Sequence, residues 1–130
     1  MKIAVVGSRT FNNRVFLMSI LNEHVKSEDE LISGGASGAD ALAYWFAEIY
    51  QIPITIYLPN FTIIKRNKET GYPPIEKVVW PHKGAGLMRN TTIVENSDLV
   101  IAFWDGESRG TLDTIQKCEK MNKKILVFKN

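Results

Sequence analysis

The stretch Lys2-Ile3-Ala4-Val5-Val6-Gly7-Ser8-Arg9 near the start of the sequence decides the fold class. Residues 2–6 form a nearly continuous apolar run that stops at Gly7, which is typical of a strand buried on both faces. Strands of this kind occur in parallel sheets that helices cover on both sides. The stretch therefore predicts a buried parallel strand that ends in a glycine turn.

Strands and helices alternate along most of the remaining chain. Helical periodicity predicts helices over residues 14–25, 39–50, 86–95 and 111–121, and apolar runs predict strands over residues 31–33, 53–58, 98–103 and 124–128. This alternation implies right-handed crossovers and a parallel sheet. We predict one Rossmann-like α/β domain over residues 1–130, an open parallel sheet of about five strands in the order 3-2-1-4-5 with helices on both faces.

Residues 59–82 do not follow this alternation. The segment is basic in its middle and carries Pro73-Pro74 after Gly71. We interpret it as an excursion from the sheet with a short strand at 77–80.

Composition narrows the class of protein. The chain has 130 residues, 45% of them hydrophobic and 23% charged, as in ordinary globular domains. The formal charge of +2 gives little support to nucleic acid or an anionic membrane as a partner. Cys118 is the only cysteine, which excludes a disulfide framework within the chain. With neither a secretion signal nor a membrane-length apolar run, we expect a cytoplasmic protein.

Three predicted strands end in turns of glycine or small residues, at 7–9, 34–38 and 105–111. Glycine lets a ligand approach the backbone, and the helix that follows directs free amides and its positive dipole end at an anion. With the order 3-2-1-4-5, the connections diverge between strands one and four, beside Gly7 and Gly110. We therefore expect a phosphate-bearing ligand at the carboxyl ends of these strands.

These residues also have purely structural interpretations. Gly34-Gly35 fits a tight turn, Asp40 complements a helix dipole, and Ser8 and Thr111 are common at helix starts. The sequence has neither the dinucleotide-binding fingerprint nor a P-loop. His24 and His82 have no third ligand at a metal-binding spacing, so we expect no metal. Trp104, at the end of a strand, is the tryptophan best placed to stack on a base.

Five motifs carry a resemblance to a known family: residues 6–11 (VGSRTF), 33–40 (SGGASGAD), 84–90 (GAGLMRN), 97–103 (SDLVIAF) and Gly110-Thr111. In order and spacing the chain resembles the SLOG superfamily, the Rossmann-like group that includes the LOG-type and the DprA/Smf proteins. It is most similar to the small YspA-like proteins of that group.

The resemblance implies a site for nucleotide phosphate or sugar, and an arginine on the third helix that contacts the ligand. Carried over residue by residue, the implied ligand-binding residues are Gly7, Ser8, Arg9, Gly34, Gly35, Gly38, Asp40, Arg89, Asn90, Gly110 and Thr111.

LOG enzymes hydrolyse the N-glycosidic bond of nucleoside monophosphates with that arginine and a glutamate. Here Thr114 stands at the position of the glutamate, and Asp113 is its neighbour. If the chain is an enzyme, the candidate catalytic residues are Arg89 together with Asp40 or Asp113.

Three functions follow from these observations. The first is a sensing or sequestering module for a nucleotide-derived ligand related to ADP-ribose or NAD. The second is a LOG-type hydrolase, and the third is single-stranded DNA binding of the DprA kind. The superfamily also contains dimers, so a homo-oligomer is a further expectation.

Overall fold

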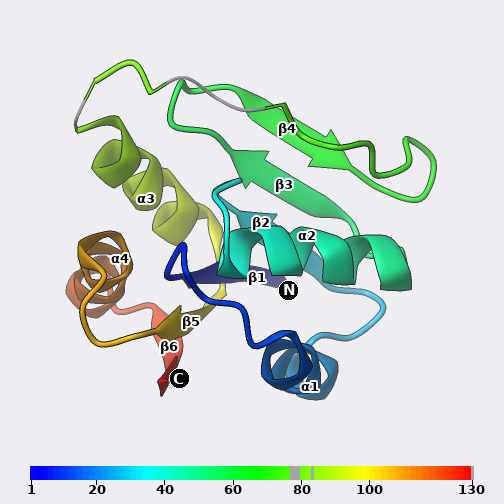
Figure 1. Ribbon diagram of the computed structural model, residues 1–130, viewed down its shortest axis with the longest axis horizontal. Coiled ribbons are helices and arrows are strands. Elements are labelled where there is room, and N and C mark those ends of the chain that lie inside the picture. The colour runs from blue at the N-terminus through cyan, green and yellow to red at the C-terminus, as the bar shows by residue number, and fades with distance from the viewer. Residues whose placement is uncertain (77–79, 83, 130) are drawn as a thin grey trace.

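The computed structural model describes residues 1–76, 80–82 and 84–129, in which six strands form one sheet and four helices cover it (Figure 1). The strands are β1 (Lys2–Gly7), β2 (Glu30–Ser33), β3 (Ile54–Tyr57), β4 (Ile63–Arg66), β5 (Leu99–Trp104) and β6 (Lys124–Lys129). The helices are α1 (Arg14–His24), α2 (Ala39–Tyr50), α3 (Ala85–Asn96) and α4 (Arg109–Lys120).

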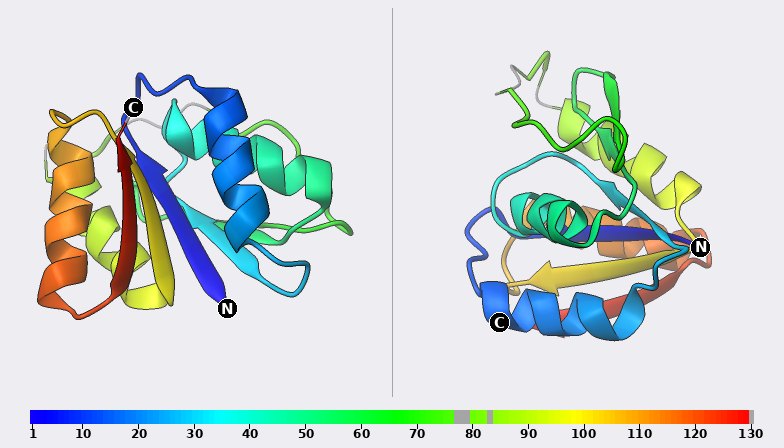
Figure 2. Two further views of the ribbon diagram at one scale, coloured as in Figure 1. Left: turned by 90° about the horizontal axis from the view of Figure 1, so that it is seen from below. Right: turned by 90° about the vertical axis from the view of Figure 1, so that its right-hand side faces the viewer.

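The strands lie in the order β4-β3-β2-β1-β5-β6. All neighbours are parallel except β3 and β4, which are antiparallel. The predicted order 3-2-1-4-5 is confirmed for the five parallel strands, and Figure 2 shows β1, β5 and β6 side by side. β1 is central, so its two neighbours, β2 and β5, belong to the two halves of the chain.

The predicted burial of β1 on both faces is confirmed, and it explains the two cores. Ile3 and Val5 point into a core built with α1 and α2, whereas Ala4 and Val6 point into a core built with α3 and α4. Alternate residues of one apolar strand thus serve opposite faces of the sheet. The helices therefore lie on both faces, as predicted.

The excursion at residues 59–82 contains a sixth strand that the periodicity did not reveal. β4 pairs antiparallel with β3, with Ile56 opposite Ile64. β4 lies at the sheet edge and its residues alternate between exposed and half-buried, so it has no apolar run. Residues 77–79 of the predicted strand 77–80 lie outside the described residues.

None of the described helices has the length and apolar character needed to cross a membrane.

Candidate functional site

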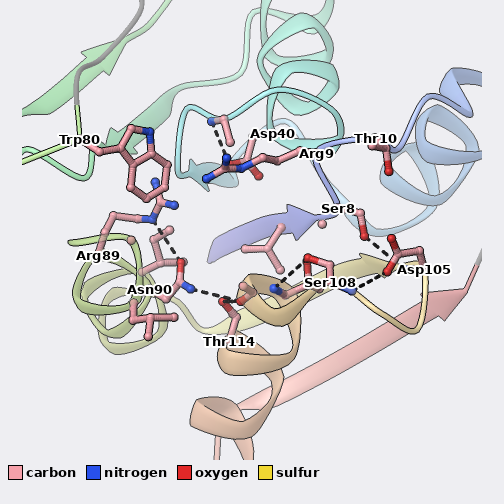
Figure 3. A pocket seen from close by; sticks show the side chains of 18 residues that line it. Ser8, Arg9, Thr10, Asp40, Trp80, Arg89, Asn90, Asp105, Ser108 and Thr114 are labelled. Carbon is pink, nitrogen blue, oxygen red and sulfur yellow. Dashed lines mark hydrogen bonds between the residues drawn. The ribbon is translucent and has the colours of Figure 1, made fainter. Parts of the chain in front are cut away.

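A cavity of about 390 Å³ opens at the carboxyl ends of β1 and β5, where the connections of the two chain halves diverge (Figure 3). We call it the switch-point cavity. Its walls come from the turn after β1, the start of α2, the first half of α3 and the start of α4. The residues that line it are Val6, Gly7, Ser8, Arg9, Thr10, Ala36, Asp40, Trp80, Gly86, Leu87, Arg89, Asn90, Ile93, Asp105, Ser108, Gly110, Thr111 and Thr114.

A second cavity of about 270 Å³ adjoins the first. We call it the side cavity. Its lining residues are Arg9, Gly34, Gly35, Ala36, Ser37, Leu58, Pro59, Ile75, Glu76, Trp80 and Arg89. Four of these residues also line the switch-point cavity, so the two cavities share a wall.

Two glycines fix the turn after β1. A Cβ on Gly7 would lie 2.6 Å from the carbonyl oxygen of Phe103, and a Cβ on Gly38 would collide with the Ser8 carbonyl oxygen. Gly38 also has a φ of +72°, a conformation that favours glycine. These contacts pack the start of α2 against the backbone of Ser8 and Arg9, whose side chains line the cavity.

Arg89, on α3, is a charged residue with only 8% exposure, and backbone carbonyls hold its side chain in place. Its Nη1 donates to the carbonyl oxygen of Gly34 at 2.6 Å and to that of Tyr57 at 3.4 Å. Its Nε donates to Oδ1 of Asn90 at 3.1 Å. Burial lowers the pKa of Arg89, and Asp40 opposes that shift. The guanidinium is thereby held in one orientation in the wall shared by both cavities.

Asp40, in the first turn of α2, is a buried carboxyl that lies near the Arg89 guanidinium, beside Gly34. Its Oδ2 accepts a hydrogen bond from the amide of Ala36 at 3.1 Å. A Cβ on Gly34 would lie 2.7 Å from Nη1 of Arg89 and 3.0 Å from Oδ2 of Asp40. Burial raises the pKa of Asp40 to about 6 even though Arg89 lowers it. This carboxyl can therefore change its protonation state near neutral pH.

Asn90 positions the arginine and the start of α4 relative to one another. Its Nδ2 donates to the Gly110 carbonyl oxygen and to Oδ2 of Asp113, both at 3.2 Å, while its Oδ1 accepts from Arg89. Asp113 also forms an ion pair with Lys117 at 2.7 Å. The side chain of Asn90 thus joins α3 to α4 across the floor of the site (Figure 3).

Thr114, which the sequence resemblance places at the position of the LOG glutamate, faces the switch-point cavity. Thr114 is 1% exposed and its hydroxyl donates to the Gly110 carbonyl oxygen at 3.3 Å. Asp113, one residue earlier, is directed to Asn90 and Lys117 and is not among the described residues that line the cavity. The carboxylate next to the threonine therefore does not replace the glutamate in this geometry.

The turn before α4 is organised by Asp105. Its Oδ1 accepts the amides of Glu107 and Ser108 at 2.8 Å, and these bonds lower the pKa of Asp105. Ser108 caps the helix by accepting from the amide of Thr111 at 3.5 Å. A Cβ on Gly110 would meet nothing within 4 Å, so the first turn of α4 presents an open surface to the cavity.

Trp80 lies in the shared wall, although no sequence pattern predicted it as a site residue. The Arg9 guanidinium carbon is 4.7 Å from the centroid of its ring, and that of Arg89 is 5.8 Å away. The ring packs on Gly86 of α3, where a Cβ would collide with it. Trp104, the predicted stacking residue, instead donates its indole NH to the Ser108 carbonyl oxygen and lines neither cavity.

The structure brings together most of the residues that the sequence predicted. Those that line the switch-point cavity are Gly7, Ser8, Arg9, Asp40, Arg89, Asn90, Gly110 and Thr111. Gly34 and Gly35 line the side cavity, whereas Gly38 and Asp113 line neither. Thr10 and Trp80 line the cavity but were not predicted as site residues. Asp105 and Ser108 lie in the predicted turn 105–111 but were not singled out in it, and Thr114 was noted only as the residue at the position of the LOG glutamate. Within the described residues no three His, Cys, Asp or Glu side chains are grouped to hold a metal ion.

Neither a family model nor a curated protein sequence matches the chain. Several solved structures, in contrast, match the fold of the chain over nearly its whole length. DNA processing protein A from Helicobacter pylori, whose structure concerns single-stranded DNA binding, has a TM-score of 0.72 and 23% identity over 98% of this chain and 64% of its own. DprA from Streptococcus pneumoniae has a TM-score of 0.73 and 19% identity over 97% of this chain and 49% of its own.

The protein TM1055 has a TM-score of 0.63 and 16% identity over 95% of this chain and 71% of its own. The chain thus spans about half to two thirds of the two DprA chains. At these identities the similarity concerns the fold: the chain has the Rossmann-like fold that DprA and LOG-like proteins share.

Proposed function

We propose that the chain is a SLOG-type module that binds a nucleotide or nucleotide-derived ligand, related to ADP-ribose or NAD, in the switch-point cavity, for sensing or sequestration. One observation carries this proposal. Arg9 and Arg89 both line the cavity, and among the described residues neither guanidinium has a carboxylate oxygen within 4.0 Å. Two arginines without an ion-pair partner are suited to a phosphate: the Arg9 guanidinium can form bidentate hydrogen bonds to it, and Arg89, whose Nη1 and Nε donate to Gly34, Tyr57 and Asn90, can add its charge and Nη2.

The remaining walls suit the other parts of a nucleotide. The N-terminus of α4 meets the cavity at Gly110 and Thr111, where a helix favours a bound anion. Ser8 and Ser108 supply hydroxyls that can bond to a sugar or phosphate. Trp80 adds an aromatic wall, with the Arg9 guanidinium 4.7 Å from its ring centroid. The volume of about 390 Å³ lies in the range of roughly 300–1,000 Å³ that is usual for ligand sites.

A hydrolase is the second candidate, and Asp40 is the observation that favours it. A carboxyl that lines the cavity with a pKa of about 6 can donate or accept a proton at neutral pH. Arg89 would stabilise the negative charge that develops on the leaving group. Against this reading, Thr114 replaces the carboxylate that LOG enzymes use. Product formation separates this candidate from binding alone.

The test is a thermal unfolding assay with a panel of AMP, ATP, NAD and ADP-ribose, in which each mixture is also analysed for products. A ligand at about 100 times its Kd stabilises the fold by roughly 2.7 kcal/mol. Arg9→Ala should reduce affinity about 10- to 100-fold, since a hydrogen bond to a charged group contributes roughly 1.5–3 kcal/mol.

Arg14→Ala is a matched control for that variant. Both arginines are exposed and stacked over a tryptophan, with Arg14 4.9 Å from the ring centroid of Trp45, but Arg14 lines neither cavity. We expect the control to bind as the wild type does. Equal losses in both variants, or no shift with any nucleotide, would contradict the proposal. Binding of an oligonucleotide with a steep salt dependence would favour DNA instead.

A further inference from the structure

We infer that the outer side of α2, together with the start of α1, is the interface of a homodimer in which a second copy of this chain binds the same surface through a two-fold axis. The inference goes beyond the proposed function and does not depend on it. It rests on three properties of this surface: its apolar character, a groove at one end, and the opposite charges of its two ends.

The outer side of α2 is apolar although no described helix or strand lies over it in Figure 1. Ala41, Trp45 and Ile49 follow one another at intervals of four residues, so they form one stripe along the helix. All three are exposed, Trp45 to 36% and Ile49 to 47%. The charged residues of α2 are Asp40, which is buried, and Glu48. An exposed helix face with so little charge is typical of a face that packs against a second surface.

A groove of about 500 Å³ adjoins the N-terminal end of the stripe. Val15 of α1 lines it together with Ala41 and Leu42 of α2, so the groove runs between the starts of the two helices. The Val15 side chain is 82% exposed. At the other end of the stripe Ile49 and Tyr50 are exposed to 47% and 48%. A groove at one end and projecting apolar side chains at the other are complementary in an isologous dimer, where two parts of one surface meet each other.

The two ends of the stripe carry opposite charges. Arg14 lines the groove and lies over Trp45, with its guanidinium carbon 4.9 Å from the ring centroid, whereas Glu48 precedes Ile49 near the other end. Both charged residues are exposed, and neither forms an ion pair within the described part of the chain. A two-fold axis midway between them places each Arg14 against Glu48 of the second copy, so that two ion pairs form together. The same axis brings Ile49 towards the groove of the second copy.

This pattern favours a second copy over an unrelated partner. A surface with a cation at one end, an anion at the other and an apolar centre matches itself under a two-fold rotation. Trp45 lies between the two charges and would be buried near the axis, and tryptophan and arginine are enriched in the centres of protein interfaces. Val15, Trp45 and Ile49 line neither the switch-point cavity nor the side cavity, so the interface and the nucleotide site are separate.

Charge reversal tests this arrangement. The molar mass of the full chain is measured by sedimentation equilibrium for the wild type, Arg14→Glu, Glu48→Arg and the double variant that carries both changes. Each single reversal replaces two attractive contacts of the dimer by two repulsive ones, whereas the double reversal restores attraction with the signs exchanged. Lys120→Glu is the control, because Lys120 is an exposed cation on α4, which packs on the opposite face of the sheet.

We expect the wild type to be a dimer and each single reversal to raise the Kd of the dimer about tenfold or more. The double variant should recover most of that loss, and Lys120→Glu should dimerise as the wild type does. A second pair of variants tests the apolar stripe. Ile49→Asp should weaken the dimer, whereas Met88→Asp, at a similarly exposed position on α3, should not.

Three results would overturn the inference: a wild type that is monomeric at about 100 µM, a double variant that dimerises no better than the single ones, or an equal loss in Lys120→Glu. Recovery in the double variant also shows that the single variants fail through the interface and not through misfolding. These outcomes leave the proposed function untouched, because nucleotide binding is measured separately in the thermal unfolding assay.

Discussion

Gly34→Ala tests whether Arg89 is held against the turn after β2. The added Cβ would lie 2.7 Å from Nη1 and 2.9 Å from Cζ of Arg89, closer than a Cβ is found in real structures. Gly34 does not have a positive φ, so alanine introduces no backbone strain and the substitution probes only the contacts of the added Cβ, the closest of which are with Arg89. Either the guanidinium moves or the turn does.

The size of the expected destabilisation follows from the interaction that Gly34→Ala disrupts. If the guanidinium moves, its 2.6 Å hydrogen bond to the Gly34 carbonyl breaks, and hydrogen bonds to charged groups contribute about 1.5–3 kcal/mol. If the turn moves, overpacking of this kind costs about 1–3 kcal/mol. We therefore expect Gly34→Ala to lower the free energy of unfolding by about 2 kcal/mol, measured by urea denaturation.

Gly110→Ala is the matched control, because its Cβ meets nothing within 4 Å and it lies in the first turn of α4. It should be neutral or stabilise the fold by about 0.5 kcal/mol through helix propensity. In an Arg89→Ala background the penalty of Gly34→Ala should shrink, since its collision partner is gone. A Gly34→Ala variant as stable as the wild type within about 0.5 kcal/mol would refute the reasoning.

Two further predictions concern buried titratable groups. The pKa of Asp40 is about 6 when folded against 3.8 for the unfolded group, so its contribution to stability is full below about pH 4 and is lost as the pH rises through 6. Asp40→Asn, which stays neutral, should lack this loss and be more stable than the wild type at pH 7, by at most about 3 kcal/mol. The free energy of unfolding of both proteins is measured by urea denaturation at pH 4 and pH 7. A difference between variant and wild type that is the same at both pH values would contradict the prediction. Cys118 is fully buried and burial raises the pKa of its thiol to about 11, so a thiol reagent at pH 8 should label it only as urea unfolds the chain. Labelling of the native protein at the rate of the unfolded chain would show that α4 opens without global unfolding.

Sequence patterns predicted the parallel part of the fold because β1 and β5 are apolar on both faces, a pattern that only a covered parallel sheet explains. They failed for β4, whose alternating exposed residues look like those of a loop and whose pairing with β3 depends on the turn at residues 58–62. Edge strands are stabilised by a neighbour and not by their own hydrophobic run, so local sequence gives little indication of them.

The site was predictable where it depends on backbone position. Gly7 ends β1, Ser8 follows it and Gly110 lies in the first turn of α4, and strand order alone placed them at one edge of the sheet. Trp80 could not be placed in this way, since it comes from the irregular excursion and reaches the cavity by packing on Gly86. The hydrogen bond from Arg89 to the Gly34 carbonyl could not be predicted either, because it joins residues 55 positions apart in the sequence.

The most direct test of the central claim is a titration of ¹⁵N-labelled protein with ADP-ribose, followed by amide chemical shifts. The account predicts that the largest shifts cluster on Ser8, Arg9, Gly110 and Thr111, which surround the switch-point cavity, and that the turn at residues 67–71 stays unchanged. Shifts centred on the basic excursion, or none at all at saturating ligand, would contradict it.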